Sequence, residues 1–127
     1  MTSSTSIVPI SRSAFSLAAQ IEGSVLALRF SGNADMSVVA PLSAAIREVH
    51  AEAVRLSVSE VRCDLKALFF MNSSCFKAFV TWIAAVESLA PDKRYRIRIL
   101  SNPQLHWQKR SLSALHAMAE SIVVIET

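Results

Sequence analysis

Two adjacent serines, Ser73 and Ser74, stand at the predicted start of a helix. Downstream, large apolar residues recur at the i, i+3, i+4, i+7 spacing of one helical face: Phe76, Phe79, Val80 and Ile83. Asn72 and the two serines have short side chains of the kind that accept hydrogen bonds from a helix's first turn. A phosphate added here would lie at the positive end of the helix dipole. The pair is a candidate phosphorylation site, although most serines at helix starts act only as caps.

The rest of the chain does not supply the partners that would make Ser73 a catalytic nucleophile. No Gly-x-Ser-x-Gly elbow surrounds it, and two glycines cannot build a phosphate-binding loop. The three histidines are scattered, and His106 and His116 lack the i, i+4 spacing of a metal-binding pair. Nothing supports a triad of Ser73, a histidine and Asp35. We therefore expect a protein that is not an enzyme, with no catalytic residue, no cofactor and no metal site.

Composition predicts one globular domain in the cytoplasm. Of the 127 residues, 52% are hydrophobic and 18% are charged, which excludes a disordered chain. No apolar run approaches the roughly 20 residues that cross a bilayer, and residues 1–13 lack the basic region followed by an apolar core that is typical of a secretory signal. Cys63 and Cys75 match no redox or zinc motif, and we expect both to be small buried hydrophobic residues rather than a disulfide. The net charge of +3 would suit an acidic partner or nucleic acid but establishes neither.

The apolar patterns predict strands and helices in alternation. Residues 1–13 are rich in hydroxyl groups and predict a flexible tail, and residues 14–127 form the domain. Strands are expected within 15–21, 24–31, 56–65, 95–100 and 122–125, and helices over 38–53, from Ser73 to about 90, and from Asn102 to about 119. The order β-β-α-β-α-β-α-β predicts an α/β domain with a mixed, mostly parallel sheet and helices packed on it.

The amino-acid sequence of the central segment, residues 64–75, resembles a known family motif. Asp64-Leu65, followed by Phe70-Met71-Asn72-Ser73-Ser74-Cys75, is similar to the Asp-Leu strand end and Met-Asp-Ser-Ser-Gly turn of the STAS domain, the anti-sigma factor antagonist family. The resemblance extends over residues 15–126. It includes the turn from Gly32 to Asp35 and the Asn102-Pro103 opening of the last helix. It implies the STAS fold in a bacterial signalling protein that regulates transcription.

The resemblance also implies a mechanism of partner switching. Reversible phosphorylation would fall on Ser73, with Ser74 as the alternative. The surface formed by Asp35, Asn72, Ser73, Ser74 and Lys77 would bind an anti-sigma factor or related serine kinase, and a serine phosphatase would reset it. Two residues depart from the family. Asn72 replaces an aspartate and removes a negative charge beside the hydroxyl, and Cys75 replaces a glycine, which we expect to narrow the pocket.

Two alternatives remain open from the sequence. The departures at Asn72 and Cys75 favour a constitutive STAS scaffold, or a homodimer, without phosphorylation. Arg94, Arg96 and Arg98 alternate with apolar residues and predict three guanidinium groups on one strand face. With Lys109 and Arg110 they would bind an anionic ligand or nucleic acid. The small basic excess and the few aromatic residues make nucleic acid the weakest of these readings.

Overall fold

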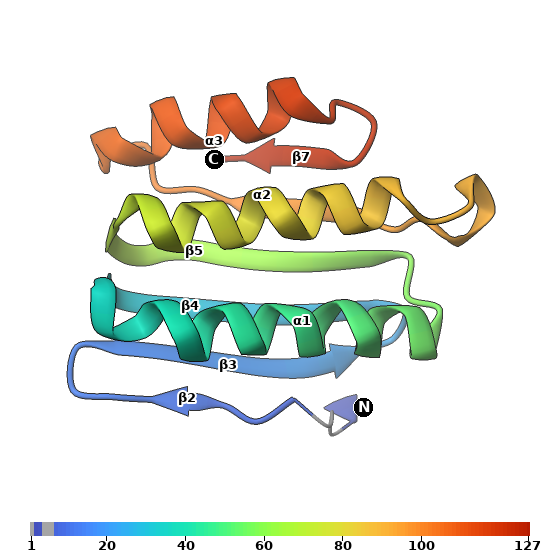
Figure 1. Ribbon diagram of the computed structural model, residues 1–127, viewed down its shortest axis with the longest axis horizontal. Helices are drawn as coiled ribbons and strands as arrows, with labels where there is room; N and C mark the ends of the chain where they lie inside the picture. The colour runs from blue at the N-terminus through green and yellow to red at the C-terminus, as the bar shows by residue number, and fades with distance from the viewer. Residues whose placement is uncertain (1, 4–6) are drawn as a thin grey trace.

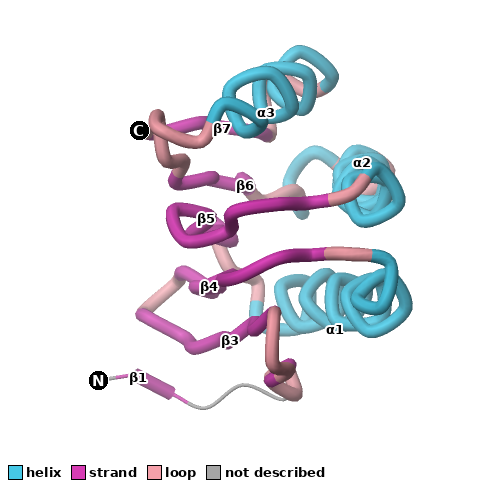
Figure 2. Tube along the Cα trace, turned by 90° about the vertical axis from the view of Figure 1, so that its left-hand side faces the viewer, coloured by secondary structure: helices cyan, strands magenta, loops and turns pink. Residues whose placement is uncertain are grey.

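A computed structural model of the chain describes residues 2–3 and 7–127. The described strands form one sheet in the order β1-β3-β4-β5-β6-β7, with β2 also paired to β3 (Figures 1 and 2). The longer strands are β3 (Phe15–Glu22), β4 (Val25–Ala34), β5 (Glu60–Met71), β6 (Arg96–Leu100) and β7 (Val123–Glu126). The hairpin β3–β4 is antiparallel, whereas β4, β5, β6 and β7 run parallel to their neighbours. The predicted mixed α/β sheet is confirmed.

Three helices cover one face of this sheet (Figures 1 and 2). They are α1 (Val39–Leu56), α2 (Ser73–Glu87) and α3 (His106–Met118), and two 3-10 turns, η1 (Met36–Val38) and η2 (Pro91–Lys93), lie between elements. The strands turn alternate side chains toward the helices, as period-2 geometry requires. Val61, Cys63 and Leu65 of β5 are therefore buried in the core, as predicted for Cys63, while Arg62 and Asp64 lie on the other face.

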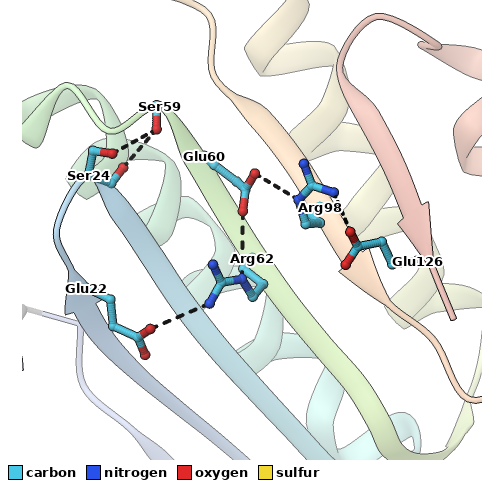
Figure 3. A network of polar contacts seen from close by, with 7 residues as sticks. All are labelled: Glu22, Ser24, Ser59, Glu60, Arg62, Arg98 and Glu126. Carbon is cyan, nitrogen blue, oxygen red and sulfur yellow. Dashed lines mark hydrogen bonds and ion pairs between the residues drawn. The ribbon is translucent and has the colours of Figure 1, made fainter.

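The face of the sheet without helices carries a ladder of charges (Figure 3). Arg62 lies between Glu22 and Glu60, at 3.5 and 3.7 Å. Arg98 lies between Glu60 and Glu126, at 2.9 and 2.8 Å. Opposite charges on neighbouring strands attract across the sheet. Together these contacts tie β3, β5, β6 and β7.

The structure moves the boundaries of several elements, most of all those of β5 and the last helix. The strand predicted within 56–65 is β5. It begins only at Glu60, because α1 extends through Leu56 and ends where Ser57 adopts a left-handed conformation, and it continues past Leu65 to Met71. The last helix begins at His106 and not at Asn102. The Asn102 side chain instead accepts the backbone N–H of Gln104 at 2.9 Å, which makes a turn ahead of the helix.

The described part of residues 1–13 packs along the sheet. The short strands β1 (Thr2–Ser3) and β2 (Ile10–Ser11) pair antiparallel with β3, and the side chain of Ile7 is buried in the core. Residues 1 and 4–6, which belong to the predicted tail, lie outside the described residues. The domain boundary between residues 13 and 14 stays a prediction.

Gly32 allows β3 and β4 to approach closely just before the end of β4. Its φ of +91° is a conformation that L side chains rarely adopt, and an added Cβ would lie 2.0 Å from the backbone oxygen of Ala14. Here β5 carries extra residues relative to β4, because the pairing shifts between Arg29 and Ser31 and again between Gly32 and Asn33. The glycine thus holds the strand end from which Asp35 emerges.

Candidate functional site

The candidate site lies where the parallel strands β4 and β5 end together. Ala34 pairs with Met71, and the backbone N–H of Asn72 donates to the oxygen of Ala34 at 3.0 Å. Asp35 and Asn72 therefore follow two adjacent strand ends, the edge of an open α/β sheet at which ligands commonly bind. The structure thus brings together two of the predicted partner-binding residues that are distant in sequence.

Asn72, and neither serine, is the cap of α2. Its side-chain oxygen accepts the backbone N–H of Cys75 at 2.8 Å. Ser73 and Ser74 are the first two residues of the helix, and neither hydroxyl forms a hydrogen bond with any described residue. Ser73 is exposed and Ser74 is half-buried. The site therefore presents two free hydroxyls at the positive end of a helix dipole.

Asp35 acts as a cap in the neighbouring turn. Its carboxylate accepts hydrogen bonds from the Ser37 backbone N–H at 2.9 Å and from the Ser37 hydroxyl at 2.6 Å. The hydroxyl bond, then the backbone bond and the positive charge of Arg12, hold the pKa of Asp35 below its usual value. The side chain is exposed and negatively charged, so the capping role and a place in the binding surface are compatible.

Cys75 is buried beneath this edge. Its thiol contacts the backbone oxygen of Asp35 at 3.7 Å, and its pKa is raised by burial and by the Asp35 charge. The side chain fills interior space between β4 and α2. The expectation that a side chain in place of glycine narrows the surface pocket is therefore wrong, because the side chain points into the core.

The predicted partner surface divides into two parts. Asp35, Asn72 and Ser73 lie at the strand ends. Ser74 and Lys77 line a groove between α1 and α2, and Arg47 and His50 of α1 also line it. Ser74 is adjacent to Ser73 in the first turn of α2, so the two parts meet there.

Three exposed apolar side chains at this end of the sheet were missed by sequence reasoning. Phe69 is 57% exposed, Phe70 is 47% exposed, and Met36, two residues beyond the end of β4, is 70% exposed. We call these three residues the apolar patch. Regular alternation would place only one of two consecutive phenylalanines toward solvent, but the register shift between Gly32 and Asn33 falls opposite them. The available signal was two consecutive large aromatic residues, separated from the helix cap Asn72 by Met71 alone.

Two of the three histidines, His50 and His116, have hydrogen-bond partners other than the serines. His50 Nδ1 lies 2.7 Å from the Tyr95 hydroxyl, and His116 Nδ1 lies 2.8 Å from the oxygen of Val123. Within residues 2–3 and 7–127, no histidine hydrogen-bonds to Ser73 or Asp35, and no group of three or more His, Cys, Asp or Glu residues is placed to hold a metal ion. In the same ranges no helix is both long and apolar enough to span a bilayer.

The basic face predicted for Arg94, Arg96 and Arg98 forms only in part. Arg94 precedes β6, and its guanidinium donates to the backbone oxygens of Glu87, the last residue of α2, and of Leu89 just beyond it. Arg98 is held between two carboxylates in the charge ladder. Of the three, Arg96 alone forms no side-chain hydrogen bond or ion pair with a described residue. The geometry therefore disfavours a phosphate-binding stripe.

Comparison with solved structures shows the fold. The chain matches the crystal structure of an anti-sigma factor antagonist from Mycobacterium paratuberculosis with a TM-score of 0.66, at 19% sequence identity, over 92% of this chain and 90% of that one. No protein family model matches the chain, and no curated protein matches it in sequence. The chain has the fold of a STAS domain. The resemblance carried by residues 64–75 is thus confirmed at the level of the fold.

Proposed function

We propose that this protein is a non-enzymatic cytoplasmic interaction module that acts in bacterial transcription control as an anti-sigma factor antagonist. It would bind an anti-sigma factor or related serine kinase through the surface around Asp35, Asn72 and Ser73. The fold supports this role, since the matched structure is an antagonist of this kind. The observation that carries the proposal is the free, exposed hydroxyl of Ser73 at the start of α2. Because Asn72 caps the helix, a phosphate on Ser73 would break no capping hydrogen bond.

Phosphorylation of Ser73 would then switch the surface. A phosphate adds about −1.5 to −2 charges at neutral pH, and the free N–H groups of the first turn of α2 stabilise it. The added charge stands at the strand edge that also carries the Asp35 carboxylate, so the surface becomes strongly negative. A partner that binds the unmodified surface through apolar contacts would be released. A serine phosphatase would restore binding.

The test is phosphoryl transfer from a purified candidate serine kinase and ATP to the full chain. Wild type and Ser74→Ala should incorporate one phosphate, and Ser73→Ala should incorporate none. Transfer lost in Ser74→Ala and kept in Ser73→Ala would assign the site to Ser74. No transfer to the wild-type chain would contradict the proposed switch.

A constitutive scaffold is the second candidate function, and the apolar patch favours it. Met36, Phe69 and Phe70 are each exposed near the ends of β4 and β5, where they would contact a partner, or a second copy of this chain, without any modification. In that case the affinity for the partner should be equal for wild type, Ser73→Ala and Ser73→Asp. A loss of affinity in Ser73→Asp alone would favour the switch.

A further inference from the structure

The groove between α1 and α2 has a volume of about 330 Å³. Ile46 of α1 and Ala78, Trp82 and Ala85 of α2 give it an apolar lining. Ala78 and Ala85 are seven residues apart and so lie on the same face of α2. Their methyl groups are too short to fill the space between the two helices, which leaves room for side chains from outside.

The walls of the groove carry positive charge without compensation. Arg47 on α1 and Lys77 on α2 both line it, both are exposed, and neither forms an ion pair with a described residue. No aspartate or glutamate is among the lining residues. His50 also lines the groove, and burial lowers its pKa, so it is neutral near pH 7. The groove therefore attracts negative charge.

We propose that this groove binds an amphipathic helix with acidic flanks, supplied by the partner protein. Two helices lying side by side form a groove that accepts a third helix, whose apolar face packs on the floor. From Ser74 to Ala85 the groove follows α2 for roughly 16 Å, about three helical turns. Carboxylates on the flanks of the incoming helix reach Arg47 on one side and Lys77 on the other. The inference rests on the proposed function, because it names the chemistry of the proposed partner.

The position of the groove couples it to the candidate switch. Ser74 lines one end of the groove, and Ser73 precedes it in the same helical turn. A phosphate on Ser73 would stand beside that end and repel an acidic helix, while also competing for Lys77. Phosphorylation at Ser73 would therefore weaken binding in the groove without blocking it sterically.

The experiment uses the full chain and a fluorescently labelled synthetic helix of roughly 18 residues, five turns, with leucines on one face and glutamates on both flanks. Fluorescence anisotropy should show saturable binding that weakens as salt is added. The double variant Arg47→Glu/Lys77→Glu should bind at least about tenfold more weakly. The matched control Lys93→Glu/Arg110→Glu reverses two exposed charges outside the groove and should bind as wild type does.

Two further arms make the outcome decisive. Ala85→Leu fills the groove without changing charge and should also weaken binding, and a peptide with lysines in place of the glutamates should not bind. Failure of the acidic peptide to bind, or equal binding by wild type and the groove double variant, overturns the inference. Phosphoryl transfer to Ser73 is measured separately. The groove can therefore be rejected while the proposed function stands, and the reverse result is equally visible.

Discussion

The side-chain oxygen of Asn72 accepts the backbone N–H of Cys75 at 2.8 Å, and this bond separates the helix cap from the candidate phosphorylation site. If a serine were the cap, its hydroxyl would be occupied by the helix itself. With Asn72 in that position, Ser73 and Ser74 keep free hydroxyls within the first turn. An aspartate at position 72 could make the same bond with a full negative charge, so the asparagine preserves the geometry and changes only the charge.

The first prediction tests, by the stability of three variants, whether Asn72 or Ser73 caps α2. Asn72→Ala should lower the free energy of unfolding by about 1 kcal/mol, because the N–H of Cys75 loses its acceptor. Asn72→Asp should keep the bond, and its charge at the start of the helix dipole should raise the free energy of unfolding by about 0.3–1 kcal/mol. Ser73→Ala should stay within about 0.5 kcal/mol of wild type. Urea unfolding measures all three, and a loss in Ser73→Ala equal to that in Asn72→Ala would show that the serine is the cap.

The second prediction concerns the apolar patch. The double variant Phe69→Ser/Phe70→Ser should fold normally, since both side chains are about half exposed, but should bind the proposed partner kinase at least about tenfold more weakly. Met118→Ser is the matched control, because Met118 is also exposed and lies at the far end of α3. Surface plasmon resonance with the kinase immobilised gives the affinities. Equal losses in the patch variant and the control would remove the patch from the interface.

The third prediction compares the two glycines that have positive φ. Gly23→Ala should cost about 1 kcal/mol, because only its left-handed conformation is disfavoured and nothing lies within 4 Å of the new Cβ. Gly32→Ala should cost clearly more, roughly 2 kcal/mol or above, because the Cβ also meets the backbone of Ala14. Thermal unfolding of both variants gives the ranking. Similar midpoints for the two would contradict the close approach of β3 to β4.

The fourth prediction is a pH dependence that arises from His50. Burial lowers its pKa, and its Nδ1 faces the Tyr95 hydroxyl, which already accepts the N–H of Trp82 at 2.7 Å and so has its own proton to donate. The unfolded chain therefore binds a proton that the folded chain resists. The contribution of His50 to the free energy of unfolding should be fully present above about pH 6.5, its pKa in the unfolded chain. It should fall as the pH drops toward the lower pKa of the folded chain.

The measurement is urea unfolding of wild type and His50→Gln between about pH 8 and about pH 5. The loss of stability on acidification should be smaller in His50→Gln, since that variant lacks the titrating group. Other titrating groups act equally in both proteins and cancel in the difference. If the free energy of unfolding depended on pH in the same way in both proteins, the His50 ring would lie in solvent and not against Tyr95.

The sequence predicted the α/β order and the positions of the central elements because those depend on local patterns. The apolar spacing from Phe76 predicted α2, and the Glu22-Gly23 pair predicted the hairpin of β3 and β4. The continuation of β5 past Leu65 could not be read locally, because it depends on irregular pairing with Ser31 to Ala34. The exposure of Phe69 and Phe70 depends on the same irregularity.

The burial of Gln108 could not be predicted from local sequence patterns. The side chain is buried, its amide donates to the backbone oxygens of Leu65 and Leu68 at 2.6 and 3.2 Å, and its oxygen accepts the N–H of Asn102. A glutamine on a helix reads as a surface residue by composition. Here it satisfies backbone groups of β5 at the irregular pairing with β4, which become its partners only in the folded chain. The Asp35–Asn72 edge was found because residue types and a family resemblance marked it.

The most direct test of the central claim is peptide mass spectrometry of the protein isolated from its own cells under growth and stress. We predict one phosphate, localised to Ser73, whose occupancy changes between conditions and disappears in Ser73→Ala. A protein that stays unmodified in every condition would contradict the switch. The apolar patch and the free surface around Asp35 would then define a constitutive partner or dimer interface.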